Sequence, residues 1–306
     1  MSEPTDAPDT DADDAGKHPL VSVVLPTLGT GDAIAQCLDA ILAQDYPNFE
    51  LLIAVDRPDG TIPALFTSAA ANDGRVKLIA SNGKSGASAR RNQGIAEARS
   101  EIVFFTDDDV TVSADWLTRG IRYFDDPGTV GIEGKLVYVD DNRKPHYSDR
   151  VVENVTGGLY MTANAAYRRD ALTAVGMFDE DIIWYEDREL GLRMAGLGRI
   201  VFAQDCIAYH QHSRHTARSF MGEAQKVRIR TIVMKKTGDR AQMWGRVYSP
   251  DKLVAMLFPP LVLWRLHTHR MTTADDWLCL LLAYPRLWYE RFLLWRWAFR
   301  ERFFVV

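Results

Sequence analysis

The sequence has few cysteines, no excess of basic residues and no long hydrophobic run. Its 3 cysteines, Cys37, Cys206 and Cys279, lie far apart and form no CxxC pair, which argues against a zinc site or disulfide framework and favours a reducing compartment. The net charge of -5 and pI of 5.8 offer no overall basic surface to nucleic acid. The longest apolar stretches, 253–264 and 277–285, fall short of the roughly 20 residues that cross a bilayer as a helix.

The chain length and the acidic start suggest how the chain is divided. A chain of 306 residues can bury one large core with an appendage. The first residues are acidic and contain no apolar core of a signal peptide. We therefore expect a disordered acidic tail over 1–18, a main domain over 19–225 and a helical C-terminal region over 226–306.

Short apolar runs alternate with helical patterns in the first third of the chain. Strands are predicted at 21–25, 49–55, 76–80 and 102–105, each followed by a segment with helical spacing. This alternation indicates βαβ units and a Rossmann-like α/β fold with a mostly parallel sheet. Ligands of such sheets bind where the strands end.

Acidic residues follow two of these strands. Asp56 ends the second, and Asp107, Asp108 and Asp109 end the fourth. Side chains alternate along an extended chain, so Asp107 and Asp109 should point one way and Asp108 the other. Two carboxylates on the same side of the strand end repel each other unless a cation lies between them. A divalent cation that also binds substrate phosphates suits such a site. The simpler alternative is a solvated acidic turn that caps the next helix.

Further polar residues follow later strands. Glu186 and Asp187 fall in the first turn of a predicted helix, where carboxylates also simply complement the positive helix end. Segments with strand character at 200–202 and 207–208 precede His210 and His212. The simplest interpretation of these two histidines is a polar loop after a strand. The segment 140–155 is polar and irregular, and we expect a mobile loop there, beside the site.

Several motifs together resemble the family 2 glycosyltransferases of the GT-A fold, over about 19–215. They are VSVVLPT, the acid after LLIAV, GASARRNQGIAEA, FFTDDDV, GGLYMTANAAYRRDALTAVGMFDE and YEDRELGLRM, in the order that the family has them. The resemblance implies transfer of a sugar from a nucleotide-sugar donor to an acceptor, with inversion at the anomeric carbon.

The resemblance also assigns roles to individual residues. It implies that the nucleotide is held by Pro26, Thr27, Asp56 and Arg91, with Asp108 beside them. It implies Mg²⁺ or Mn²⁺ on Asp107 and Asp109, with His210, or failing it His212, as a further ligand. Asp187 would be the general base and Glu186 its orienting neighbour. The chain departs from the family at Leu28-Gly29 and in the segment 56–60, which leaves UDP and GDP both open as the donor nucleotide.

The C-terminal region differs in composition from the rest. From Lys252 onward eight Lys/Arg face four Asp/Glu, interleaved with tryptophan and phenylalanine. This pattern is typical of amphipathic helices that lie in a membrane interface, although the helices could instead pack on the main domain or form a dimer contact. A membrane-facing region suggests a dolichyl- or polyprenyl-linked glycan acceptor. We expect a peripheral or monotopic enzyme on the cytoplasmic face of the cell membrane, acting in surface polysaccharide synthesis or protein N-glycosylation.

Two other functions are compatible with parts of the sequence. A sugar-phosphate nucleotidyltransferase would share the sheet and the metal chemistry, but LPTLGTGDAI lacks the arginine expected in its first loop. A non-catalytic scaffold subunit would have no need for Asp107, Asp109, Glu186 and Asp187 together. We therefore expect a metal-dependent glycosyltransferase.

Overall fold

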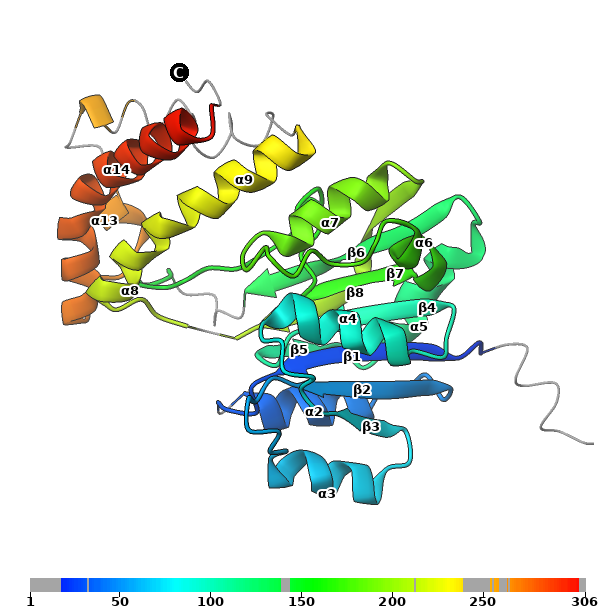
Figure 1. The fold of residues 1–306 in the computed structure, drawn as a ribbon. Helices are drawn as coiled ribbons and strands as arrows, with labels where there is room; N and C mark the ends of the chain where they lie inside the picture. The colour runs from blue at the N-terminus through cyan, green and yellow to red at the C-terminus, as the bar shows by residue number, and fades with distance from the viewer. Residues whose placement is uncertain are drawn as a thin grey trace, which may run out of the picture.

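The computed structural model describes residues 18–31, 33–138, 144–211, 213–238, 254, 256–258, 263 and 265–302. The predicted tail, apart from His18, and His212 lie outside these residues. Figure 1 shows one sheet with helices on both faces and, beside it, a group of C-terminal helices.

The first half of the sheet is parallel. Strands β1 (Val21–Thr27), β2 (Phe49–Val55), β3 (Val76–Ile79) and β4 (Ile102–Thr106) are arranged in the order β3-β2-β1-β4. All three pairings in this half are parallel. The chain reverses its direction of progress across the sheet at β1, which lies between β2 and β4, and such a switch point is where α/β sheets bind ligands.

The second half of the sheet is mixed and contains both parallel and antiparallel pairings. Strand β7 (Asn164–Arg168) is antiparallel to both β4 and β6 (Thr129–Tyr138). Strand β8 (Arg199–His210) is parallel to β6, and the short β5 (Val110–Val112) is antiparallel to β8. The full order of the eight strands is β3-β2-β1-β4-β7-β6-β8-β5.

Each face of the sheet buries its own apolar cluster. One cluster contains the apolar sides of α2, α3 and α5, and the other contains those of α4, α6 and α7. Strand residues alternate between the clusters, so that Val23 enters the first and Val24 the second. The bounds are α2 Ile34–Leu42, α3 Ala64–Asn72, α4 Ala87–Glu97, α5 Trp116–Ile121 followed by η1 Arg122–Asp125, α6 Arg169–Ala174 and α7 Glu186–Ala195.

The C-terminal helices form a separate layer. Helix α9 (Val227–Thr237) lies between α7 and the 27-residue α14 (Ala274–Arg300) (Figure 1). The layer also contains α8 (Ala217–Gly222), η2 (Glu223–Lys226) and α13 (Arg265–Thr268). The domain boundary expected after residue 225 therefore falls inside η2. Among the helices of the described residues, none is both long and apolar enough to cross a membrane.

Candidate functional site

The ends of β1, β2 and β4 meet at one edge of the sheet. Thr27 and Val55 are paired in register at the ends of β1 and β2, and β4 ends one residue beyond its last pairing with β1. Buried apolar runs therefore stop together, and the polar residues that follow them gather at this edge.

Asp56 is bonded to the start of α4 through one carboxylate oxygen, and its other oxygen has no hydrogen-bond partner. Its Oδ2 accepts hydrogen bonds from Ser85 Oγ at 3.0 Å and Gly86 N at 2.8 Å. Its Oδ1 has no hydrogen-bond partner, and Arg90 Nε lies 3.7 Å away. The Nε and Nη1 atoms of the buried Arg90 also lack partners. Buried polar atoms are rarely left unpaired, so this corner suits a ligand with hydrogen-bonding groups.

Pro26 and Thr27 contribute to this edge from within β1. Pro26 is buried opposite Ala54 of β2. The hydroxyl of Thr27 donates to Asp108 Oδ2 at 2.6 Å and accepts from Gly29 N at 2.8 Å. Thr27 thus fixes Asp108 and the turn after β1, next to Asp56.

The three aspartates form a turn after β4 and do not continue the strand as expected. Val110 N donates to Asp107 O at 3.2 Å and closes the turn. Asp107 and Asp109 nevertheless face one cleft, while Asp108 turns away to Thr27. Burial raises the pKa of Asp108, and burial together with the charge of Asp107 raises the pKa of Asp109. A nearby cation would lower both pKa values.

His210 is the last residue of β8 and lies beside Asp109. The sequence indicated a loop at this position, but His210 is paired with Val110 of β5. Its Nε2 is 3.5 Å from Asp109 Oδ2, and its Nδ1 is 2.9 Å from Gln211 O. The Nδ1 atom is thus paired with a backbone carbonyl and Nε2 is the nitrogen that faces Asp109, an arrangement that is common in metal-ligating histidines.

Arg91 joins the aspartate turn to the start of α7. The side chain is buried, and it donates to Asp107 Oδ1 at 2.7 Å and to Glu186 Oε1 at 2.9 Å. Both ends of the guanidinium are thus engaged with carboxylates, so Arg91 positions two acidic groups of the cleft. The family resemblance implies that Arg91 helps to hold the nucleotide or its phosphates, and this role stays a prediction.

Asp187 lies in the first turn of α7, which begins after an unusual backbone conformation. Tyr185 precedes the helix with φ of 65°, a left-handed conformation that costs a non-glycine residue about 1–2 kcal/mol. Burial, followed by the charge of Glu186, raises the pKa of Asp187 to about 7. A carboxylate with this pKa is suited to accept a proton near neutral pH.

A buried glutamate shapes the loop that borders the cleft. Glu133 of β6 accepts hydrogen bonds from the backbone of Gly158, Leu159 and Tyr160 at 2.5–2.9 Å. It also accepts one from Asn154 Nδ2 at 3.1 Å. These bonds fold the segment 154–160 against the sheet, and several of its residues line the cleft.

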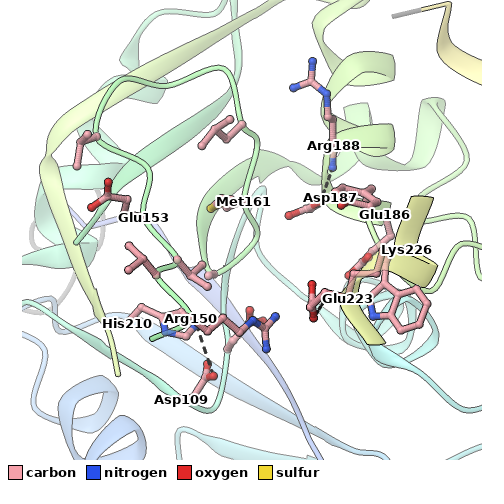
Figure 2. A pocket seen from close by; sticks show the side chains of 18 of the residues that line it. Asp109, Arg150, Glu153, Met161, Glu186, Asp187, Arg188, His210, Glu223 and Lys226 are labelled. Carbon is pink, nitrogen blue, oxygen red and sulfur yellow. Dashed lines mark hydrogen bonds and ion pairs between the residues drawn. The ribbon is translucent and has the colours of Figure 1, made fainter. Parts of the chain in front are cut away.

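A single cleft of ≈ 810 Å³ (Figure 2) is lined by the predicted metal and catalytic residues Asp107, Asp109, Glu186, Asp187 and His210. The predicted nucleotide-binding residues Pro26, Thr27, Asp56, Arg91 and Asp108 are not among the residues that line it. Asp107, Asp109 and His210 form one side, which we call the strand side. Trp184, Asp187, Glu223 and Lys226 form the other, which we call the helix side. In Figure 2 the side chain of Arg150 extends between the two sides.

The helix side combines an aromatic ring with charges. Trp184 is 39% exposed, and Lys226 Nζ lies 5.4 Å from its ring centre. Lys226 Nζ is also 2.7 Å from Glu223 Oε1. The charges of Lys226 and Arg150 lower the pKa of Glu223 against the effect of burial. An exposed tryptophan beside a carboxylate and an ammonium can stack on a sugar ring and bind its hydroxyls.

The strand side fits a divalent cation held jointly with a substrate. Among the described side chains, no group of three or more His, Cys, Asp and Glu converges into a preformed metal site. Asp107 Oδ1 is already bonded to Arg91. Oxygen atoms from one or two carboxylates, completed by substrate phosphates, are how proteins commonly hold Mg²⁺. The donor set of Asp107, Asp109 and His210 is compatible with that arrangement.

Some residues of the cleft were not found from the sequence. Glu133, the buried acid in the apolar run VGIEGKLVYV, was detectable because a charge inside a strand needs partners. Arg150, Trp184, Glu223 and Lys226 carry no local signal, because they come from three separate segments that only the fold brings together.

A family model described as Glycosyl transferase family 2 matches residues 22–176. Among curated proteins, glycosyltransferase AglE of Haloferax volcanii is 29% identical over 207 residues, which cover 63% of this chain and 67% of that protein. Three further relatives are matched over 14%, 30% and 49% of their own lengths. Others are named for the biosynthesis of succinoglycan and amylovoran.

Solved structures resemble the whole chain at low sequence identity. The mannosyltransferase PcManGT of Pyrobaculum calidifontis, in complex with GDP-Man and Mn²⁺, has a TM-score of 0.58 and 19% identity, and the match covers 92% of this chain and 84% of that one. S. aureus TarS 1–349, in complex with UDP-GlcNAc, has a TM-score of 0.53 and 16% identity, with coverage of 94% and 93%. This likeness confirms the GT-A fold predicted from the sequence.

Proposed function

The chain belongs to glycosyl transferase family 2, and we propose that it transfers a sugar from a nucleotide-sugar donor to a glycan acceptor. One observation carries the proposal. A carboxylate with a pKa of about 7, Asp187, lines the same cleft as the acidic turn of Asp107 and Asp109. A base on one side and a diphosphate-binding group on the other are the two requirements of this transfer.

The donor nucleotide is proposed to bind at the ends of β1 and β2. The unpaired Oδ1 of Asp56 can accept a hydrogen bond from a base or ribose, and Arg90 and the start of α4 hold Asp56 in place. Thr27 and Asp108 close the neighbouring corner. The solved relatives were crystallised with a GDP-sugar and a UDP-sugar, so both nucleotides belong in the test.

The diphosphate is proposed to lie on the strand side. Asp107, Asp109 and His210 would hold Mg²⁺ or Mn²⁺ there, and such an ion neutralises the charge that develops on a departing nucleoside diphosphate. Arg91 keeps Asp107 directed into the cleft by bonding its other oxygen. The same arginine holds Glu186, so it fixes the distance between the donor phosphates and the base.

Asp187 is proposed to accept the proton of the acceptor hydroxyl. As the hydroxyl oxygen bonds to the anomeric carbon, the bond to the nucleoside diphosphate breaks on the opposite face. A single displacement of this kind inverts the anomeric configuration. Glu186, adjacent to Asp187, favours the protonated product of this step by its charge, and its bond to Arg91 keeps it in position.

The acceptor is proposed to be a glycan that stacks on Trp184 and is carried on a dolichyl or polyprenyl phosphate. Exposed aromatic rings bind sugar faces, and Glu223 and Lys226 can bond hydroxyls beside the ring. The names of relatives in polysaccharide biosynthesis support a glycan acceptor. Such a lipid carrier would place the enzyme peripherally on the cytoplasmic face of the cell membrane.

The proposal is tested by incubating the protein with UDP- and GDP-sugars and Mn²⁺ and measuring the release of nucleoside diphosphate. Release from one class of donor, increased by a glycan acceptor, is expected. If the protein binds a donor but releases nucleoside diphosphate from none of the donors tested, the result would support the scaffold alternative. Formation of nucleotide sugar from sugar phosphate and nucleoside triphosphate would support the nucleotidyltransferase alternative.

A further inference from the structure

Helix α14 carries a continuous row of exposed apolar side chains. The row contains Trp277, Leu281, Trp288, Phe292, Trp295 and Phe299, and we call it the outer row. Leu281 is 73% exposed and Phe299 is 90% exposed. At about 100° of rotation per residue, the six side chains fall within an arc of roughly 60°. Such a narrow apolar stripe on a surface helix marks an interaction site.

The opposite side of α14 is already used for folding. Leu293 and Leu294 pack with Val227 and Met234 of α9. Near the start of the helix, Cys279 and Leu280 belong to a second cluster with Tyr147 and Ala283. The outer row is therefore not needed to hold the helix on the protein, and its replacement should leave the fold intact.

The start of α14 is fixed to the segment that leads into the cleft. Asp276 is fully buried and forms a capping box with Thr273. It also accepts hydrogen bonds from Ser148 Oγ at 2.7 Å and Ser148 N at 3.0 Å. Arg150, two residues further, lines the cleft. Whatever binds the outer row is thus held in a fixed relation to the cleft.

The charges around the outer row indicate what binds it. Arg296 and Arg300 are exposed on one flank of the row, about 70° and 110° from its centre. Their guanidinium carbons also lie 6.0 and 5.3 Å from the ring centre of Trp297. At about 100° per residue, Asp275 and Glu290 fall on the other half of the helix, at least roughly 130° from the centre of the row. Among the described residues of α14, cations border the apolar row and no anion lies within it, so the row complements a surface that is apolar inside and anionic outside.

The kinds of apolar residue also favour lipid over a second copy of the chain. Three of the six residues are tryptophans, which are enriched at the boundary between headgroups and acyl chains. A helix pair favours Leu, Ile and Val in its seam, and here the exposed face contains Pro285 and bulky indoles. A second copy would also bring its own Arg296 and Arg300 to the contact.

We infer that the outer row of α14 docks in the plane of an anionic bilayer, with Arg296 and Arg300 at the headgroups. The 27 residues of the helix give a contact about 40 Å long. The docked helix would hold the cleft at a fixed height above the bilayer. The docking itself does not depend on the proposed function. Only its consequence, that the acceptor is presented from the membrane, rests on that function.

Vesicle flotation of the full chain, without donor or acceptor, tests the inference. The protein should float with phosphatidylcholine–phosphatidylglycerol vesicles and bind pure phosphatidylcholine more weakly. Leu281→Ser with Phe299→Ser should lower the partition coefficient about 100-fold, because each removes the burial of a large apolar side chain. Arg296→Gln with Arg300→Gln should lower it about 25-fold, at about fivefold per cation. Leu197→Ser, at an exposed leucine just after α7, should have no effect.

Several outcomes would overturn the inference. If the protein binds no vesicle of any composition, the outer row does not dock on lipid. If the Leu281→Ser, Phe299→Ser variant binds vesicles as well as the wild type does, another part of the chain makes the membrane contact. If light scattering shows that the wild type is a dimer and that this variant is a monomer, the outer row binds a second copy of the chain. Melting temperatures equal to that of the wild type exclude unfolding as the cause. Docking without any sugar transfer would refute the proposed function and leave the membrane face standing.

Discussion

The two sides of the cleft are built in different ways. The strand side is made of residues at the ends of buried strands, where Asp107 is bonded to Arg91 and Asp109 lies beside His210. The helix side is assembled from η2, the start of α7 and the exposed Trp184. One side is rigid because the sheet is rigid, and the other depends on the packing of the C-terminal helices.

This difference suggests a division of labour between the sides. The family match at residues 22–176 contains the strand-side Asp107 and Asp109. The helix side, with Trp184 and η2, lies beyond the matched residues. We therefore propose that donor binding uses the part of the fold that the family model matches and that acceptor choice depends on the helix side.

Replacing Asp187 should give the largest loss of activity. Asp187→Asn keeps the shape of the side chain but removes the base, which is expected to lower kcat by about 10²–10⁴-fold. Donor affinity, measured by calorimetry, should be unchanged because the strand side is intact. Asp181→Asn, at an exposed aspartate outside the cleft lining, is the matched control. Weakened donor binding in Asp187→Asn would argue against its role as a base.

Asp109→Ala should impair the departure of the nucleoside diphosphate on the strand side. Loss of a charge-stabilising group on the strand side is expected to lower kcat by about 10²–10³-fold. Mn²⁺ binding, followed by electron paramagnetic resonance with and without nucleoside diphosphate, should weaken in parallel. Asp115→Ala, a partly exposed aspartate that pairs with Arg119, should leave the metal signal unchanged. If Asp109→Ala binds Mn²⁺ as well as the wild type does, Asp109 is not a ligand of the metal.

Trp184→Ala should separate the two sides most clearly. Loss of a stacking surface is expected to raise the acceptor KM by about tenfold, the cost of about 1.4 kcal/mol of apolar contact. The donor KM should stay constant. Ile183→Ala, at a neighbouring exposed residue outside the cleft lining, serves as control. A change in the donor KM alone would place Trp184 on the donor side.

The pKa of Asp187 predicts two modest pH effects of opposite sign. Transfer should fall about tenfold per pH unit below pH 7, because the base becomes protonated. Stability should behave differently, because a carboxyl with a raised pKa stabilises the fold when protonated and loses this contribution as pH rises through about 7. Relative to the wild type, Asp187→Asn should thus melt higher at pH 8.5 than at pH 5, by about 3 °C. A pH-independent difference in melting temperature would contradict the raised pKa.

The strand side could largely be predicted from the sequence. Runs such as VSVVL, FELLIAV and IVFF stop abruptly at polar residues, and parallel strands align their ends. The turn that contains Asp107 and Asp109 matches only the alternative interpretation of the sequence, because alternation applies only while the chain remains extended. His210 was expected in a loop, and its pairing with Val110 depends on a strand of only three residues.

Apart from Asp187, the residues of the helix side could not be predicted from the sequence, for physical reasons. Strand β7, with the sequence NAAYR, has no long apolar run, yet its antiparallel insertion determines where the chain passes the cleft. Trp184 and Lys226 are separated by more than forty residues in the sequence. They meet because α9 packs between α7 and α14, an arrangement fixed by tertiary contacts and not by local spacing.

The anomeric configuration of the product tests the central claim most directly. Once a donor is identified, the glycosidic linkage formed by the wild-type protein can be assigned by proton NMR of the early product. The account predicts a configuration opposite to that of the donor, since Asp187 acts as a base for one direct displacement. A product with the donor's configuration would require a different mechanism and would contradict the role given to Asp187.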